Sequence, residues 1–231
     1  MKAYLDQGNT QLKLWIPCVE HKIAVANDAD WRAVLAKVIS ESSLEQFVVA
    51  SVAGDQKLNL LLSFLKQYGE VESITTDQDC GWTVRPCYQD VARLGVDRLL
   101  AMEAAYRLEG RAVIVIDCGS AVTVDVVSDE GLHLGGYIVP GYRLQQRSLL
   151  LDTSLEFNAI ETSLALGQST DQCINFGIAR MVYSLCQSVI EQFNRPAVFL
   201  TGGDLDGVLG LFSELGSVKP DLVFKGMSYL K

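Results

Sequence analysis

The sequence lacks the segments that would place the chain in a membrane or outside the cell. It contains no run of about 18 uninterrupted apolar residues, which a transmembrane helix requires. Asp6 and the polar turn that follows it interrupt the N-terminal apolar stretch, so no signal peptide is predicted there. We therefore expect a cytoplasmic protein that does not interact with a membrane.

An excess of basic residues is also missing. The 231 residues include 28 acidic and 19 basic side chains, which gives a formal net charge of −9. Nucleic-acid binding depends on basic surface, so this balance argues against a nucleic-acid partner. An anionic ligand would have to be held by local cations, by a metal ion or by backbone N–H groups.

Cysteine and histidine are too scattered to form a recognisable metal site. The six cysteines contain no Cys-x-x-Cys pair, and the two histidines lie far apart in the sequence. This spacing disfavours a zinc site and a Ser-His-Asp triad. In a chain of this length without a secretion signal, we expect the cysteines to be mostly buried free thiols without disulfides.

The residues that are present describe two similar halves. The first half reads as a strand, turn and strand over 1–17, followed by alternating helices and strands at 31–39, 47–53, 57–69, 71–77 and 96–110. The second half restarts with three strands over 112–141, then a long helix over 169–193, a strand over 197–204, a short helix and a strand over 221–224. We therefore predict an α/β protein with mixed sheets flanked by helices, divided into domains 1–110 and 111–231.

Two matching turns support this duplication. Asp6-Gln-Gly-Asn-Thr and Asp117-Cys-Gly-Ser-Ala each place an Asp at the end of an apolar strand and a Gly two residues later. They lie 111 residues apart, close to half the chain. Asp and Gly are common in turns, so two unrelated hairpins are the alternative interpretation.

A third glycine-rich turn, Thr201-Gly202-Gly203-Asp204, ends another apolar strand. Glycine lets a ligand approach the backbone closely, and successive N–H groups in such turns bind phosphate. Three such turns predict a cleft between two lobes, with Asp6 and Asp117 facing each other. Neither a Walker lysine loop nor a protein-kinase glycine-rich loop is present, so a nucleotide would be held in another way.

Six motifs, in order along the chain, resemble those of the type III pantothenate kinases. They are "DQGNTQLK", "LGVDR", "DCGSAVTVDV", "GGYIVPG", the "ST" before the long helix, and "TGGD". That family belongs to the acetate kinase, sugar kinase, Hsp70 and actin superfamily. The resemblance implies two duplicated RNase H-like, actin-like ATPase lobes and a homodimer.

The resemblance also implies roles for individual residues. The ATP-binding residues would be Asp6, Gln7, Gly8, Asn9, Thr10, Gln11, Leu12, Lys13 and Ser120. The pantothenate-binding residues would be Tyr88, Gly95, Val96, Asp97, Arg98 and Thr170, with Asp97 as the general base. Asp117 would bind a monovalent cation, K⁺ or NH₄⁺, and Asp6 would hold Mg²⁺ or another divalent cation through water.

These roles suit phosphoryl transfer, which requires positioning, charge neutralisation and an acceptor for the hydroxyl proton. Lys13 and the turn N–H groups can contact phosphate oxygens, and Arg98 can bind a carboxylate with two parallel hydrogen bonds. Three positions depart from the family pattern: Gln7 replaces an apolar residue, Ser120 replaces Thr, and Cys173 replaces Ala. Ser120 keeps the hydroxyl group.

Each candidate also has a purely structural interpretation. Asp97 stands at the start of a predicted helix, where Asp is a favoured N-cap. The other candidates have alternatives as packing, capping, turn or surface residues: Arg98, Tyr88, Thr170, Asp117 and Lys13. If Asp117 is buried at the end of its strand, its charge requires a partner.

The predicted activity is ATP-dependent phosphorylation of pantothenate to 4′-phosphopantothenate, the first step of coenzyme A biosynthesis. One alternative is a kinase or phosphatase of the same superfamily that acts on another small acid or sugar. A second is a non-catalytic regulator on the same fold, similar to the Bvg accessory factor proteins.

Overall fold

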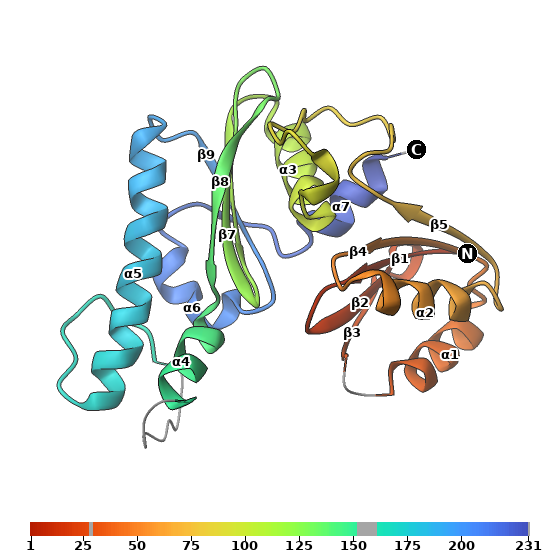
Figure 1. The fold of residues 1–231 in the computed structure, drawn as a ribbon, viewed down its shortest axis with the longest axis horizontal. Coiled ribbons are helices and arrows are strands. Elements are labelled where there is room, and N and C mark those ends of the chain that lie inside the picture. The colour runs from red at the N-terminus through yellow and green to blue at the C-terminus, as the bar shows by residue number, and fades with distance from the viewer. Residues whose placement is uncertain (28–29, 152–160, 231) are drawn as a thin grey trace. The chain divides into compact units, whose positions relative to one another are not determined.

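The computed structural model describes residues 1–27, 30–151 and 161–230, and it divides into two compact units (Figure 1). The first unit contains Met1–Ala104 and Val223–Lys231, and the second contains Ala105–Leu222. Each unit is built on one mixed sheet of five strands with flanking helices. This architecture confirms the predicted fold class, while the proposed boundary between residues 110 and 111 stays a prediction.

The first unit begins with an antiparallel three-stranded meander and continues with parallel strands. Its elements are β1 (Lys2–Gln7), β2 (Gln11–Ile16), β3 (His21–Ala26), α1 (Trp31–Ser42), β4 (Gln46–Ser51), α2 (Asp55–Leu65), β5 (Glu70–Ile74), α3 (Val96–Glu109) and α7 (Leu222–Tyr229). Helix α3 continues beyond Ala104 into the second unit, and α7 begins one residue before Val223. The strand order is β3-β2-β1-β4-β5, with β4 parallel to both β1 and β5. Because buried residues of β2 alternate with more accessible ones, Leu12 and Leu14 point into the core while Lys13, on the other face, is partly exposed.

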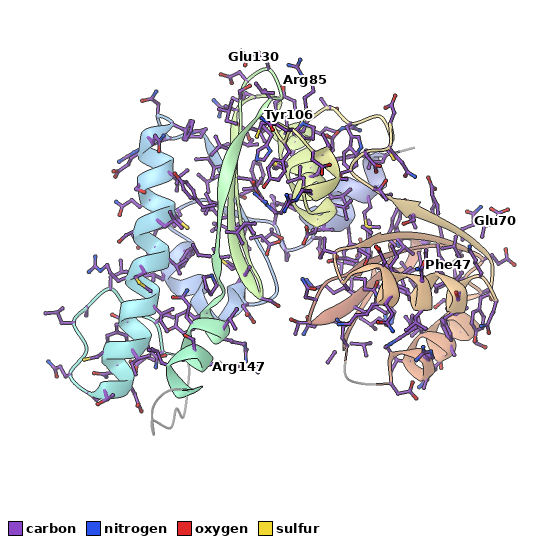
Figure 2. The ribbon with its side chains drawn as sticks, viewed as in Figure 1. Phe47, Glu70, Arg85, Tyr106, Glu130 and Arg147 are labelled. Carbon is purple, nitrogen blue, oxygen red and sulfur yellow. The ribbon has the colours of Figure 1, made fainter. Side chains whose placement is uncertain are left out.

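Helices cover both faces of this sheet. Helices α1 and α2 pack on one face, where Phe47 of β4, labelled in Figure 2, is buried in one hydrophobic cluster with Leu35 and Leu61. On the other face, Tyr4 and Val48 pack with residues of α3 and α7. The carboxyl end of β1, where the first phosphate turn begins, is therefore held between two hydrophobic cores.

The predicted strand over 221–224 is wrong, because this segment begins helix α7. A short apolar run cannot be assigned to strand or helix by periodicity alone. The helix buries Phe224 and Met227, three residues apart on one side, against the first unit. Gly226 allows this close approach, since a Cβ there would lie 2.2 Å from the carbonyl oxygen of Leu100.

The second unit repeats the connectivity of the first. It contains β6 (Val113–Cys118), β7 (Ala121–Val127), β8 (His133–Pro140), α4 (Tyr142–Leu151), α5 (Thr170–Gln192), β9 (Ala197–Thr201), α6 (Leu205–Phe212) and β10 (Ser217–Val218). The strand order, β10-β9-β6-β7-β8, places each strand where its counterpart lies in the first sheet. Strands β6 and β9 pair in parallel, as β1 and β4 do.

Helix α5 is long and apolar enough to cross a membrane by length and composition. In the structure one side of it packs on the second sheet, where Ile178, Val182 and Val189 are buried with Val124. This packing is typical of a core helix in a globular protein.

The expectation that most cysteines are buried is wrong. Of the six, only Cys118 and Cys186 are buried. Cys18, Cys87 and Cys173 are exposed because they lie in connecting segments or on the outer side of a helix.

Candidate functional site

The first phosphate turn connects β1 to β2. The Gly8 N–H donates to the carbonyl oxygen of Gln11 at 2.9 Å and closes the hairpin. The side-chain amide of Asn27 donates to the carbonyl oxygens of Gly8, at 3.0 Å, and of Asn9, at 2.7 Å. Sequence reasoning missed Asn27, because its role depends on the pairing of β3 with β2, which brings it beside the turn.

Asp6 is the most perturbed carboxylate near this turn. It is 8% exposed, and burial raises its pKa to about 6. Lys13, its cross-strand neighbour, opposes this increase, while the negative charge of Asp97 adds to it. The carboxylates of the first turn and of the "LGVDR" motif are therefore electrostatically coupled within one unit, although 90 residues separate them in the sequence.

The stretch from Asp6 to Lys13 does not present all of its side chains to a ligand. Gln7 is buried, and its Oε1 accepts a hydrogen bond from Ser51 Oγ at 2.8 Å across the parallel β1–β4 pair. Leu12 belongs to the hydrophobic core. The side chains of Asn9, Thr10 and Gln11 are exposed. Gln7 and Leu12 can thus offer only backbone groups to a ligand.

Helix α3 carries the "LGVDR" motif at its first turn. The carbonyl oxygen of Gly95 accepts the N–H of Leu99 at 3.2 Å, which makes Asp97 the second residue of the helix and not its N-cap. Asp97 Oδ1 instead accepts the N–H of Arg98 at 2.8 Å. A Cβ on Gly95 would lie 2.5 Å from this oxygen, so the glycine makes room for the carboxylate. Val96, beside it, is buried and packs in the core.

Arg98 and Tyr88 meet in the structure. Arg98 is only 9% exposed, so its interpretation as a solvated surface residue is wrong. Its Nη1 donates to Tyr88 Oη at 3.0 Å. A buried guanidinium beside a tyrosine hydroxyl is an arrangement that can receive a small carboxylate.

Three glycine turns of the second unit converge at the ends of β6, β8 and β9. The Gly119 N–H donates to Ala121 O at 3.0 Å, and the Gly141 N–H donates to Ser120 O at 3.0 Å. The Asp204 N–H donates to Cys118 O at 2.8 Å. Ser120 is exposed at this convergence. The "DCGS", "GGYIVPG" and "TGGD" motifs therefore form one cluster of backbone turns.

Asp117 lies inside this cluster. A Cβ atom added to Gly119 would lie 3.3 Å from Oδ1 of Asp117, and one added to Gly202 would lie 2.5 Å from the same oxygen. Gly202 also has a φ of +110°, which L side chains rarely adopt. The side chain of Arg143, at the start of α4, donates from Nε to Asp204 Oδ1 at 3.1 Å and links two of the turns. Arg143 was not among the sequence-predicted residues.

Thr170 is the first residue of α5 and is exposed. The N-cap of the helix is Ser169, whose Oγ accepts the N–H of Gln172 at 3.3 Å. The interpretation of Thr170 as the cap is therefore wrong, and its role in substrate binding stays a prediction.

Comparison with known proteins identifies the family. A sequence model of the type III pantothenate kinases matches residues 4–192, which include five of the six motifs but not the "TGGD" turn at 201–204. The chain belongs to the type III pantothenate kinase family. Type III pantothenate kinases from Alcanivorax borkumensis and Pseudomonas aeruginosa are 33% and 36% identical to it. The alignments cover 98% and 97% of this chain and 97% and 96% of the two relatives.

Solved structures support the fold. A conserved Campylobacter jejuni protein, described as a Baf family transcriptional activator, matches with a TM-score of 0.65 at 22% identity. The match covers 98% of this chain and 96% of that one. A Sinorhizobium meliloti protein, described as a 2-dehydro-3-deoxygalactonokinase, matches with a TM-score of 0.57 at 13% identity, covering 99% and 95% of the two chains. At these identities the likeness concerns the fold alone.

Proposed function

We propose that this chain transfers the γ-phosphoryl group of ATP to pantothenate, the first step of coenzyme A biosynthesis. The observation that carries this proposal is the family match over residues 4–192. The product would be 4′-phosphopantothenate. The clustering of Asp6, Tyr88, Asp97 and Arg98 in one unit supports a site that performs this chemistry.

Arg98 and Tyr88 would bind the acceptor. Pantothenate carries a carboxylate, which a guanidinium can bind with two parallel charge-assisted hydrogen bonds. The Tyr88 hydroxyl accepts from Arg98 and fixes the orientation of the guanidinium. Because Arg98 is nearly enclosed, a carboxylate bound there gains more from the charge than it would at an exposed site. Gly95 and Val96 would contribute backbone groups, and Thr170 a hydroxyl group.

Asp97 would act as the general base. Asp97 and Arg98 are neighbours on α3. Pantothenate would therefore extend from Arg98, which would bind its carboxylate end, to Asp97, which would face the end that carries the reacting hydroxyl. The Arg98 N–H holds Oδ1 of the carboxylate in a fixed orientation. Asp97 would accept the proton of the substrate hydroxyl as that oxygen attacks the phosphorus atom.

The glycine turns would hold the phosphates of ATP. In the first unit, backbone N–H groups of the turn at Gly8 and the ammonium group of Lys13 would contact phosphate oxygens. In the second unit, Ser120 and the turns at Gly119 and Gly202 would do the same. These groups supply positive potential locally in a protein whose net charge is −9.

The residues also fit the cations that the family implies. Asp6 is a buried carboxylate whose pKa burial raises, so a nearby cation would stabilise its charged form. We propose that Asp6 holds Mg²⁺ through water and that Asp117, which is partly buried beside Gly119 and Gly202, holds K⁺ or NH₄⁺. When bound, these ions would neutralise charge on the transferring phosphoryl group.

We also propose that the protein works as a cytoplasmic homodimer. The apolar helix α3 and the family resemblance both suggest a dimer, although Leu99, Leu100 and Met102 of this helix are buried within the chain. Strand β8, an edge strand, instead exposes Leu134, Tyr137 and Ile138. An exposed apolar edge strand favours pairing with another chain.

A coupled assay of ADP release, with and without pantothenate, tests the proposed function. A pantothenate kinase releases ADP only when pantothenate is present, together with an equal amount of phosphopantothenate. A kinase of another small acid or sugar would release none with pantothenate, and a regulator on the same fold would release none with any such acceptor. Either result would contradict the proposal.

A further inference from the structure

Glu103 is a buried carboxylate that the proposed chemistry does not use. It lies on α3 and is 0% exposed. Both of its oxygens accept the N–H of Thr83 at 3.0 Å, and Oε2 also accepts the N–H of Val84 at 2.8 Å. A buried carboxylate is costly unless it is hydrogen-bonded, and bonds to a charged acceptor are stronger than neutral ones. These contacts therefore fix Thr83 and Val84 firmly to the helix.

The segment that Glu103 holds leads to Tyr88. It belongs to the long connection between β5 and α3, residues 75–95. Connections of this length without much regular structure are uncommon and are often functional. Near its two ends, the Thr76 Oγ1 hydroxyl donates to the carbonyl oxygen of Val91 at 2.8 Å. This hydrogen bond holds the start and the end of the connection together.

Helix α3 therefore holds the connection at two points. Glu103 binds the backbone at Thr83 and Val84, and Arg98 binds the side chain of Tyr88. The two helical residues are five positions apart, or roughly 7.5 Å along the axis. Their partners, Thr83 and Tyr88, are also five positions apart. The connection passes these two contacts in the opposite order from α3, so the two segments run antiparallel. Pro86 stands between the two points and restricts the backbone there.

We propose that Glu103 is a positioning residue for pantothenate binding. By fixing the backbone at residues 83 and 84, it sets where Tyr88 stands relative to Arg98. This inference rests on the proposed function, because it assigns Tyr88 and Arg98 to the acceptor site. Glu103 itself would not touch the substrate.

The proposal predicts a selective kinetic effect. Glu103→Ala removes the hydrogen bonds to the N–H groups of Thr83 and Val84, so Tyr88 should be displaced from Arg98. The KM for pantothenate should rise on the order of tenfold or more, since small displacements of positioning groups have large effects. The KM for ATP should change by less than about twofold, because loss of acceptor binding leaves the phosphate turns intact. Glu103→Gln keeps an acceptor oxygen and should recover most of the loss.

Met102→Ala is the matched control. Met102 is the neighbouring residue on α3 and is equally buried, so its truncation leaves a cavity and destabilises the unit without removing the contacts of Glu103. If the effect of Glu103→Ala were only general destabilisation, Met102→Ala would change the KM for pantothenate to the same extent. That result would overturn the proposal.

Amide hydrogen exchange gives a readout that does not depend on activity. Amide exchange at Thr83 and Val84 should be faster in Glu103→Gln than in the parent, and faster still in Glu103→Ala. The amides of β1 should stay protected in both variants. Faster exchange with an unchanged KM for pantothenate would overturn the positioning role and leave the proposed function standing. Unchanged exchange at these amides would show that Glu103 does not hold the backbone at Thr83 and Val84, and would also overturn the proposal. A parent enzyme that is inactive with pantothenate would refute the proposed function. The exchange experiment would still show whether Glu103 holds the backbone at Thr83 and Val84.

Discussion

At the scale of single residues, the site combines groups that are unfavourable for folding with groups that hold them in place. Asp6 is buried next to the charge of Asp97, and Lys13 compensates only part of the cost. Such perturbed carboxylates cluster at functional sites. The uncompensated charge is consistent with binding of a cation in the working enzyme.

Replacement of Asp6 by Asn should stabilise the ligand-free protein and abolish its activity. The folded-state pKa of Asp6, about 6, exceeds its reference value of 3.8, so the folded state binds the proton more tightly. The free energy of unfolding therefore falls as the pH rises from about 4 to about 6. Asn removes this dependence, so the variant should be more stable by up to about 3 kcal/mol above pH 6 and by little near pH 4.

Urea unfolding without metal or nucleotide, measured between pH 4 and pH 8, checks this expectation. Asp90→Asn, at an exposed carboxylate, is the control and should change the stability by less than about 0.5 kcal/mol. A gain for Asp6→Asn that is the same at every pH would show that burial of charge is not the cause.

The sequence identifies the residues proposed to bind ligands or transfer a proton better than it identifies the residues that hold them in position. Asp6, Asp97 and Arg98 could be predicted because they stand in motifs whose order matches a known family. Asn27, Ser51 and Glu103 could not, since each acts through contacts with residues at least 18 positions away. Their roles depend on strand register and on helix placement, which local patterns do not specify.

At the scale of elements, glycine turns at strand ends form both candidate phosphate sites. In the second unit they pack so closely that a side chain on Gly202 would meet Cys118 O at 2.3 Å. The positive φ of this residue adds strain for any other amino acid. The turn therefore requires glycine for its shape.

Gly202→Ala should disrupt this turn and weaken ATP binding. The clash is with backbone, so the β9–α6 turn must move, and the KM for ATP should rise on the order of tenfold or more. The KM for pantothenate should change less. Gly177→Ala is the matched control, because Gly177 lies inside α5 with nothing near a new Cβ. It should leave the kinetics unchanged and stabilise the protein by about 0.5–1 kcal/mol, as unfolding measurements would show.

An equal KM for ATP in Gly202→Ala and the parent would contradict the assignment of this turn to the nucleotide.

Element prediction from the sequence succeeded where periodicity and turn residues agreed, as in the helix that ends at Gly110 with a φ of +74°. It failed at 221–224, where four residues are too few to show a period. The alternative interpretations of Asp97 and Thr170 as helix caps differ from the observed helix starts by two positions and one position, which is a usual error at helix ends.

At the scale of the whole molecule, the chain repeats one topology twice. The matched order of β3-β2-β1-β4-β5 and β10-β9-β6-β7-β8 explains why the Asp-x-Gly turns follow the corresponding strands β1 and β6. The sequence revealed this duplication because the turns recur at equal places in both halves. It did not reveal that the last helix packs with the first unit, since that depends on tertiary contacts of Phe224 and Met227.

The exposed edge of β8 should mediate a homodimer. Ile138 is 61% exposed there, and a charge at this position should oppose association. In sedimentation at micromolar concentration, the parent should be a dimer and Ile138→Asp largely a monomer. Leu60→Asp, at an exposed leucine of α2, should remain a dimer. A parent that sediments as a stable monomer would refute the dimer, and a dimeric Ile138→Asp would place the interface elsewhere.

The most direct test of the central claim is the formation of 4′-phosphopantothenate by Asp97→Asn at saturating ATP and pantothenate. Asn keeps an oxygen that can accept the Arg98 N–H, but it cannot serve as the proton acceptor. Turnover should therefore fall on the order of 10²- to 10⁴-fold, while the melting temperature changes little and pantothenate still binds through Arg98. Turnover close to that of the parent would contradict the account, because Asp97 could not then be the general base.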